Sequence, residues 1–549
     1  MGPRAQVSGA PGLTRRAALA VPLLMAGCRN AAPTSFDGSW LGASHERGHR
    51  LRDAADFKPD TTHRCAVAIV GGGVAGLAAA RALRAAGIDD LQLFELESEG
   101  GGNTRGHVMA GMACPLGAHY LPLPGPDAHE VGEWLHELGL LRSVAGRTVA
   151  DERHLCHSPQ ERLWIDGQWV DGLLPPAERG SAREQQYRRF AKAVADASRT
   201  LRFALPTQRA PWTPGHAALD AQPFSQWLAD QGLDEAGLLW YLDYACRDDY
   251  GAGLHSVSAW AGLHYFASRH GFRAPGDEAG AEREGVFTWP EGNAWLARRL
   301  AAPLGERLQA NALVQRIETT RHEVALDVQR FAGAPRSERW LAQQVIVALP
   351  LHVAVRVIAQ PPGALRDAAV QVTHAPWLVA NLQLRAPLTD KPGAPPSWDN
   401  VLFGNAPSPA LGYVDAMHQS LRPAPGPTVL TAYWALGDGN RIAIARKRQA
   451  LLDDSWRTWS QRVVDDLARA HPDLPAKTAR IDLMRYGHAM AIPAPGLRSS
   501  SALRALAQPL ADAPRLHFAH SDLAGYSVFE EAFTFGHAAG RAAAIALRR

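Results

Sequence analysis

The sequence predicts an α/β protein in which two domains are interleaved along the chain. Its 549 residues exceed what one hydrophobic core normally serves, so two interleaved domains are expected. Residues 65–70 (CAVAIV) are uniformly apolar, as a strand buried on both faces of a parallel sheet requires. A glycine-rich turn at residues 71–76 follows at once and opens a helical run over 77–86, which Gly87 ends. This order of strand, turn and helix is typical of the start of a doubly wound α/β domain.

The composition excludes several classes of protein. Hydrophobic residues at 46% and charged residues at 20% are ordinary for a folded chain and exclude extensive disorder. A formal net charge of +3 is too small for a nucleic-acid-binding surface. The five cysteines form no CxxC pair and are too scattered for a disulfide framework. They are Cys28, Cys65, Cys114, Cys156 and Cys246.

The amino terminus has the pattern of an export signal. Arg15 and Arg16 precede an apolar run over residues 17–27, which is too short to span a bilayer. Twin arginines before such a run indicate export of the folded protein by the Tat translocon. Leu24 to Cys28 (LMAGC) resembles a lipobox, so Cys28 is expected to carry a lipid anchor. An ordinary basic, apolar start with a free cysteine is the alternative.

Residues 29–63 follow this signal and lack apolar periodicity, so they predict a tether between residues 1–28 and the folded domains. His45 to His49 (HERGH) matches the H-E-x-x-H pattern that holds zinc on one face of a helix. Gly48 inside the motif, Gly42 before it and the absence of an apolar stripe argue against a helix there. A solvated segment without metal is expected.

The glycine turn has the context of a dinucleotide-binding site. Gly71 permits the tight turn, Gly73 lets the backbone approach a pyrophosphate, and Gly76 lets the helix pack closely on the strand. A second strand over residues 91–94 then ends at Glu95. Its carboxylate is placed to accept hydrogen bonds from ribose hydroxyls. We therefore predict a Rossmann-like domain that binds a dinucleotide.

Glu95 is followed by Gly101 and Gly102, and this arrangement resembles the second signature of the flavin amine oxidase and phytoene desaturase superfamily. Asn103 stands where that superfamily usually has Arg, with Arg105 nearby. The resemblance implies that the dinucleotide is FAD. It also implies a glutathione-reductase-like flavoprotein with an FAD-binding domain and an α+β substrate domain.

Three further segments resemble the same superfamily. Residues 115–120, which include His119, resemble the strand beneath the isoalloxazine, and residues 308–314 with 345–350 resemble the return strands of the FAD domain. The resemblance implies that the Val314 backbone meets the adenine. Residues 518–536 resemble the closing motif, which implies three contacts: Asp522 on the ribityl chain or diphosphate, and Glu531 and Ala532 on a helix that begins near the flavin.

These matches divide the chain into alternating pieces. The FAD-binding domain is expected at residues 64–154, 286–355 and 481–549. A helical cap at residues 155–285 and a sheet at residues 356–480 are expected to form the substrate domain.

The candidates for substrate contact are His119, Tyr486 and His488, because the last two lie where related oxidases place residues facing the flavin. Asp248 and Asp249 in the cap could attract a cation. Each such side chain is more often an ordinary core or capping residue.

No second G-x-G-x-x-G follows another apolar strand, so NAD(P)H is not expected and electrons should come from an organic substrate. The predicted reaction is transfer of a hydride to flavin N5 from a small organic molecule, most naturally an amine, with reoxidation by oxygen or an electron acceptor of the cell envelope. A C–C desaturase or isomerase shares every FAD motif, and a lipoprotein with a non-catalytic flavin is a further alternative. The expected location is the periplasm or cell envelope, with membrane contact only through Cys28.

Overall fold

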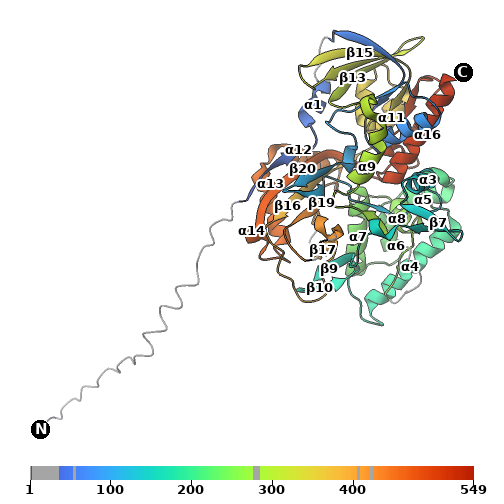
Figure 1. Cartoon of the computed structure of the whole chain (residues 1–549). Coiled ribbons are helices and arrows are strands. Elements are labelled where there is room, and N and C mark those ends of the chain that lie inside the picture. The colour runs from blue at the N-terminus through green and yellow to red at the C-terminus, as the bar shows by residue number, and fades with distance from the viewer. Residues whose placement is uncertain are drawn as a thin grey trace.

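The structure is a computed structural model, and it describes residues 2, 36–52, 57–275, 285–404, 408–420, 422 and 424–548 (Figure 1). Arg15, Arg16, the apolar run and Cys28, on which the predicted export signal depends, lie outside the described residues. Among the residues that are described, no helix is long and apolar enough to cross a membrane.

The first sheet is the predicted parallel one. Its parallel strands run in the order β12 (Leu308–Gln309), β3 (Leu91–Phe94), β2 (Thr61–Val70), β15 (Arg336–Val347) and β21 (Leu516–Phe518). β14 (Val324–Arg330) and β13 (Ala312–Thr319) extend it as antiparallel strands beside the first half of β15. The chain leaves this sheet and returns to it twice, so the predicted α/β fold with interleaved domains is confirmed.

Two long helices cross one another against this sheet. α2 (Val74–Ala85) follows β2, and α16 (Phe529–Leu547) packs on it and on β15. Glycines make the close crossing possible, because a Cβ at Gly536 would lie 2.0 Å from the Ala75 carbonyl oxygen. A Cβ at Gly540 would lie 2.5 Å from the Ala79 carbonyl oxygen. α3 (His129–Glu137) and α9 (Ala294–Ala301) pack against this pair.

The second sheet has eight strands and supports the substrate side of the molecule. Their order is β1 (Asp37–Leu41), β20 (Thr478–Ala491), β16 (His374–Leu384), β19 (Thr428–Ala435), β18 (Ala410–Asp415), β17 (Asp399–Leu402), β9 (Glu161–Ile165) and β10 (Gln168–Asp171). α12 (Arg441–Asp453), α13 (Trp456–Leu467) and α14 (Leu474–Lys477) lie beside this sheet in Figure 1. α12 packs on β16 and β20.

A group of helices closes the remaining side (Figure 1). They are α4 (Ala182–Thr200), α5 (Pro214–Asp220), α6 (Phe224–Asp230), α7 (Ala236–Tyr250) and α8 (Ala259–Ala267). α8 contacts the other four, and most of its side chains are buried, as a helix that is apolar on nearly all sides requires. α10 (Leu351–Val357), α11 (Gly363–Gln371) and α15 (Ser501–Leu506) complete the set, with the short strands β4 (Gly106–Met109), β5 (Met112–Pro115), β6 (Tyr120–Pro122), β7 (Leu141–Val144), β8 (Arg147–Ala150) and β11 (Val286–Thr288).

Two predicted boundaries differ from the structure. The boundary expected at residues 480/481 falls inside β20, which stays in the eight-stranded sheet through Ala491 because β16 pairs with it over its whole length. β9 and β10, expected in the helical cap, belong to the same sheet through the pairing of β9 with β17.

The predicted tether was wrong over residues 37–52. β1 joins the eight-stranded sheet as an edge strand parallel to β20, and Ser39 donates hydrogen bonds from its amide and hydroxyl to Asp482 at 3.0 and 3.1 Å. The ring of Phe36 packs edge-on against Trp456. A short strand held by polar contacts and one buried ring carries no periodicity that a sequence pattern could show.

The H-E-x-x-H segment forms a five-residue helix, α1 (His45–His49). This differs from the prediction, which took Gly42 and Gly48 as evidence against a helix. The two imidazoles meet edge to face, with ring centroids 5.5 Å apart, and His45 Nδ1 lies 3.5 Å from Arg485. Within the described part of the chain, no group of three or more His, Cys, Asp or Glu side chains could hold a metal ion.

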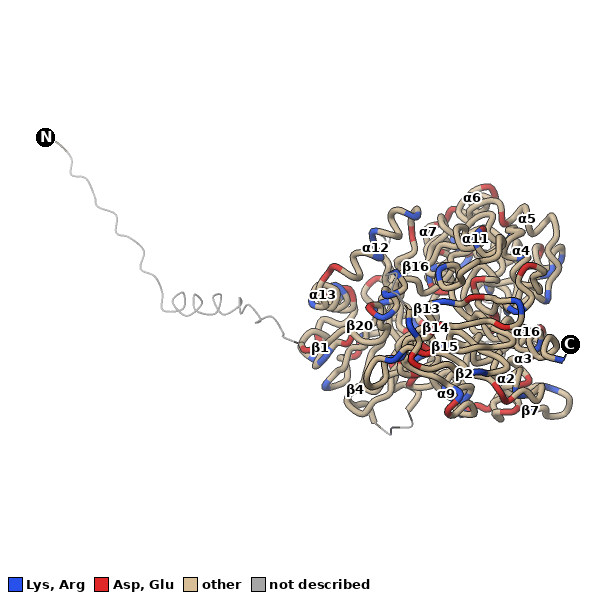
Figure 2. Tube along the Cα trace, turned by 90° about the horizontal axis from the view of Figure 1, so that it is seen from above, with Lys and Arg blue, Asp and Glu red and all other residues tan. Residues whose placement is uncertain are grey.

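Figure 2 shows basic and acidic residues interspersed over the described chain rather than gathered into one face. This distribution agrees with the small net charge of +3.

The helix crossing gives a first prediction. Gly540→Ala should lower the melting temperature of the FAD-loaded protein, because overpacking against the α2 backbone costs roughly 1–3 kcal/mol. Gly132→Ala is the matched control, since a Cβ on that α3 glycine meets no atom within 4 Å. The control should be neutral or stabilise by roughly 0.5–1 kcal/mol. Equal melting temperatures for the two variants would contradict the close crossing.

Candidate active site

The turn between β2 and α2 is built around three glycines. Gly71 has φ +107°, and a Cβ there would lie 2.3 Å from the Ala348 carbonyl oxygen. A Cβ on Gly76 would lie 1.9 Å from the Gly71 carbonyl oxygen, so no side chain fits at either position. Gly73 differs, because a Cβ there would meet no atom within 4 Å. The space beside Gly73 is therefore open for a ligand, as the pyrophosphate role requires.

Glu95 ends β3 beside this turn. Its buried carboxylate accepts hydrogen bonds from the amides of Gly72 and Glu97, each at 2.8 Å. Burial raises the pKa of Glu95, while those two hydrogen bonds act in the opposite direction. Arg105 does not neutralise it directly, since its guanidinium forms its ion pair with Glu97 at 3.6 Å. Ribose hydroxyls are suitable further donors, so these residues fit the adenosine end of FAD.

The predicted second glycine signature lies directly over the first. Gly101 and Gly102 have φ values of +133° and +57°, and a Cβ on Gly102 would come within 3.2 Å of the Gly73 Cα. Asn103 donates from Nδ2 to the Ala489 carbonyl oxygen at 2.7 Å, and its own carbonyl oxygen accepts from the Ala118 amide at 2.9 Å. Asn103 thus joins the glycine signature to β20 and to the segment at residues 115–120.

These elements surround one cavity of about 400 Å³. The predicted residues that line it are Gly71, Gly73, Glu95, Gly101, Gly102, Asn103, His119, Tyr486, His488 and Ala532. Gly76 does not line it, which agrees with its expected role in packing. The cavity runs from the glycine turns, through the first turn of α16, to aromatic and acidic side chains of the substrate side.

Three predicted cofactor contacts lie elsewhere. Val314 is a buried residue of β13 at a bulge in its pairing with β14 and does not line the cavity. Asp522 does not line it either, because its fully buried carboxylate accepts from the Leu351 amide at 2.9 Å and pairs with His374 at 3.0 Å. Burial opposes the charged form of Asp522. The ion pair with His374 outweighs burial and places the pKa of Asp522 well below its usual range.

Glu531 is the third. Its Oε1 accepts from the Thr207 amide at 2.6 Å and from the Tyr526 hydroxyl at 2.9 Å, which ties α16 to the helical cap. Glu530 lines the cavity in its place. Successive helical residues point about 100° apart, so a shift of one residue selects a different face of the helix.

Both helices that meet at the cavity begin without a side-chain cap. Gly73 is the N-cap of α2 and Val528 is the N-cap of α16, and both residues line the cavity. The amides of a helical first turn have no partner within the helix and carry a partial positive charge. The cavity therefore offers two anion-stabilising positions, one at the glycine turn and one toward the substrate side.

Aromatic side chains wall the substrate end. The hydroxyls of Tyr433 and Tyr486 donate to the carbonyl oxygens of Gly117 and Leu116 at 3.0 and 2.9 Å, so their rings rather than their hydroxyls face a ligand. His119 stacks on Tyr433 with ring centroids 4.4 Å apart, and burial lowers the pKa of His119 to about 3. A neutral imidazole is thus part of an apolar wall.

An acidic group completes this end of the cavity. Asp248 and Asp249 from α7 and Glu530 from α16 line it together with Arg269. Arg269 is already paired with both oxygens of Asp249, at 3.0 and 3.1 Å. Burial, with the neighbouring charge of Asp249, raises the pKa of Asp248 to about 6, and burial raises the pKa of Glu530 to about 7. The local arrangement disfavours further negative charge and favours a cation.

His488 lies apart from the acidic group. It stacks on His352 with centroids 4.3 Å apart, and His374 meets His352 edge to face at 4.8 Å. Burial and its neighbour His352 lower the pKa of His488 well below its usual range. The structure brings His119 and Tyr486 to the aromatic wall and His488 to a different part of the cavity lining.

The sequence patterns missed several lining residues: Tyr120 as an acid partner, Arg269, Trp377, Tyr433 and Glu530. Tyr120 donates to Asp248 at 3.2 Å. Trp377 and Tyr486 are paired across β16 and β20. A strand pattern in the sequence carries no local signal that shows which of its two faces meets the cavity.

Comparison with known proteins agrees with this geometry. The family model described as flavin containing amine oxidoreductase matches residues 74–544. The L-amino acid dehydrogenase of Synechocystis sp. is 24% identical over 489 residues, which cover 87% of this chain and 94% of the relative. Putrescine oxidase bound to putrescine has a similar structure, with a TM-score of 0.63, 20% identity, and coverage of 89% of this chain and 100% of that one.

Cyclohexylamine oxidase from Brevibacterium oxydans is also similar, with a TM-score of 0.62, 17% identity, and coverage of 88% of this chain and 100% of that one. Structural likeness at such identity shows the fold alone, whereas the family model spans most of the chain. The glycine turns, Glu95 and the paired helix N-termini are what FAD requires of a protein. The chain therefore belongs to the flavin-containing amine oxidoreductase family, and it is an FAD-dependent oxidoreductase.

Proposed function

We propose that this enzyme oxidises a small organic amine by transferring a hydride from the carbon next to nitrogen to N5 of FAD, with reoxidation by oxygen or an electron acceptor of the cell envelope. The observation that carries the proposal is the shared cavity, in which the dinucleotide glycines and an acidic, aromatic-walled end meet. A protonated amine is the simplest small molecule that suits both an anionic and an aromatic lining.

Asp248 is the proposed binding group for the ammonium. Its pKa of about 6 means that the carboxylate is ionised at neutral pH, and the Tyr120 hydroxyl holds one oxygen in place. Asp249 cannot serve equally, because Arg269 already occupies both of its oxygens. Glu530, with a pKa of about 7, can hold or release a proton near neutral pH beside the first turn of α16.

The aromatic wall has a positioning role. Tyr433, Tyr486 and Trp377 come from three adjacent strands of the eight-stranded sheet, so their rings are held by a rigid support. They exclude water from the carbon that gives up the hydride and restrict how the donor can lie. When bound, FAD supplies the hydride acceptor, and the uncapped amides at the α16 N-terminus stabilise the negative charge that reduction creates.

Export is proposed on separate grounds. Arg15, Arg16 and the apolar run support transport by the Tat translocon, which suits a chain that must acquire FAD before it crosses the membrane. The position of Cys28 supports lipid anchoring. The enzyme would then act in the periplasm or at the cell envelope.

FAD binding is predicted to depend on the open space at Gly73. Gly73→Val should fold and yet lack flavin absorbance, because the new side chain would fill the space through which the backbone approaches the pyrophosphate. In the parent protein, acid precipitation should release FAD to the supernatant, since we expect no covalent bond. A yellow pellet, or a yellow Gly73→Val protein, would contradict these expectations.

Amine oxidation is tested by anaerobic reduction of the bound flavin with a panel of primary, secondary and polyamine substrates across pH. The reduction rate should rise with pH through the pKa of the bound amine, because only the neutral amine stabilises the developing iminium. Asp248→Asn should weaken amine binding about tenfold, or ~1.4 kcal/mol. It should also shift the rate profile to lower pH, because an anionic neighbour favours the protonated amine.

Asp230→Asn, on an exposed residue of α6, is the matched control and should change neither quantity. An unchanged Asp248→Asn profile would remove Asp248 from substrate binding. If no amine reduces the flavin at any pH while an unsaturated or alicyclic compound does, the enzyme is a desaturase or isomerase instead.

Location is tested by substitution of the signal. Replacing Arg15 and Arg16 by Lys should leave folded, FAD-loaded protein in the cytoplasm, and continued export would rule out the Tat route. Cys28→Ser should give a soluble periplasmic product. Membrane association that persists in Cys28→Ser would show that no lipid at this cysteine anchors the chain.

A further inference from the structure

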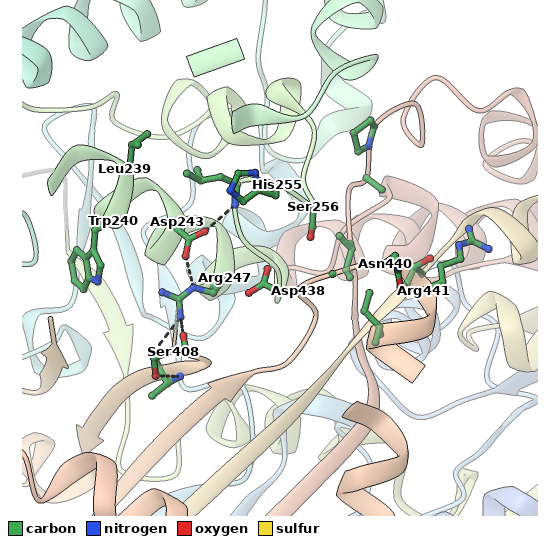
Figure 3. A pocket seen from close by; sticks show the side chains of 18 of the residues that line it. Leu239, Trp240, Asp243, Arg247, His255, Ser256, Ser408, Asp438, Asn440 and Arg441 are labelled. Atoms are coloured by element: carbon green, nitrogen blue, oxygen red, sulfur yellow. Dashed lines mark hydrogen bonds and ion pairs between the residues drawn. The ribbon is translucent and has the colours of Figure 1, made fainter. Parts of the chain in front are cut away.

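A second cavity, larger than the first, lies between α7 and the start of α12 (Figure 3). Its volume is about 1250 Å³, and of the residues that the structure describes, none lines both this cavity and the FAD cavity. Figure 3 shows Leu239, Trp240 and Asp243 on the α7 side, with Asn440 and Arg441 across from them. Neither the proposed amine chemistry nor the FAD contacts use this space.

Part of the inner surface of the second cavity is apolar, beside polar side chains such as Asp243, Asp438 and Asn440. The buried side chains that line it are Leu254, Ile444, Ile492 and Leu497, and the rings of Trp240 and Phe403 meet at 4.8 Å on its wall. Removing an apolar ligand from water into such a space is favourable in proportion to the area covered. The chemistry of the floor therefore suits a ligand with a large apolar body.

Two of the charged groups on the wall, Arg247 and Asp243, are paired with each other, while Asp438 accepts a hydrogen bond from the Gly253 amide. Arg247 is buried, its Nε donates to Asp243 at 2.8 Å, and Nη1 donates to the carbonyl oxygens of Ser408 and Ala410. Asp243 also accepts from the Leu254 amide at 3.1 Å. An ion pair fixed in this way demands no opposite charge from a ligand. His255, Ser256 and Asn440 remain as groups that can donate hydrogen bonds to carbonyl oxygens.

Two exposed apolar residues are next in the chain to residues that line the cavity. Val370 and Ile442 are 67% and 65% exposed, and they adjoin the lining residues Gln371 and Arg441. Arg441 connects the start of α12 to the end of α11, because its guanidinium donates to the carbonyl oxygens of Val370 and Gln371 at 2.6 and 2.7 Å.

Only a thin wall separates this cavity from the FAD cavity. Met490 on β20 lines one, and Ile492, just past the end of β20, lines the other; two residues of extended chain span roughly 7 Å. On α7, the consecutive residues Arg247 and Asp248 face the second and the first cavity, respectively. Electrons can cross such a distance, whereas a substrate molecule cannot pass a wall that leaves the two linings separate.

We propose that the second cavity binds a quinone, which accepts the electrons that FAD receives in the proposed function. A quinone matches the site because it has an apolar ring and tail, no charge, and two carbonyl oxygens that accept hydrogen bonds. The reaction balances as one protonated amine, one quinone and one water giving a carbonyl compound, ammonium and a quinol. Two electrons cross the wall, and the quinone takes two protons on the solvent-connected side near His255.

The binding test uses menadione, a small naphthoquinone without a long tail, with the oxidised FAD-loaded enzyme. Calorimetric titration should show one site, and Ala494→Trp, which fills the cavity from its lining, should raise the dissociation constant at least tenfold. Leu239→Lys, on the helix surface of the same wall, is a second variant that should weaken binding if the first does not fold. Ala221→Trp places the same bulk at an exposed position away from the cavity and should bind menadione like the parent.

The electron-transfer test reduces the flavin with dithionite, so its result does not depend on whether an amine is the substrate. Menadione should then reoxidise the parent and Ala221→Trp rapidly and Ala494→Trp at least tenfold more slowly, while reoxidation by oxygen stays the same in all three. Menadione binding that is absent, or equal in parent and Ala494→Trp, would overturn the proposal. So would an Ala494→Trp enzyme that binds menadione normally but is reduced slowly by its amine, since the cavity would then admit the substrate.

Discussion

The structure depends most on a close backbone contact at the first turn of α2. A Cβ on Gly76 would lie 1.9 Å from the Gly71 carbonyl oxygen, and one on Gly536 would lie 2.0 Å from the Ala75 carbonyl oxygen. The first turn of α2 is therefore held between its own strand and α16 with no side chain between them. Because α16 crosses α2 at this point, both helices begin at the cavity, and their uncapped amides face the same ligand. A single steric constraint thus supplies one positive helix end for the diphosphate and another for the reduced flavin.

The substrate end works through the opposite kind of charge. Asp248 and Glu530 come from segments about 280 residues apart in the sequence, yet both line one cavity, and burial raises the pKa of each. Carboxylates held in this way are costly in the absence of a cation, and one cation present, Arg269, is already paired with Asp249. A protonated amine would relieve that cost. The free energy that the burial of Asp248 and Glu530 costs would then be recovered as binding affinity for the amine.

Sequence patterns predicted the parts of this site that are local. The strand, the turn at Gly71 to Gly76 and the acid at Glu95 are consecutive in the chain, and their chemistry is set within about 30 residues. Glu530 rather than Glu531 lines the cavity because the rotation of α16 is fixed by its glycine contact with α2, which no local pattern reports. The motif assigned Asp522 to the ribityl chain or diphosphate, whereas its carboxylate pairs with His374, 148 residues earlier. Tyr433 and Trp377 become neighbours of Tyr486 only through the pairing of β16 with β19 and β20.

α7 contributes side chains to both cavities, although it is not an ordinary amphipathic helix with one apolar and one polar face. Glu235 caps its start by accepting from the Leu238 amide, and Gly251 ends it with φ +73°. A Cβ on Gly251 would lie 2.5 Å from that of Ala375 and 2.7 Å from the Trp377 indole nitrogen. The end of α7 is therefore pressed against β16, next to the aromatic wall. This contact fixes the rotation of α7 about its axis. Asp248 therefore faces the FAD cavity, while Asp243 and Arg247 face the second cavity. Any displacement of α7 would move the groups of both cavities together, which makes this helix the structural link between substrate binding and the space beyond it.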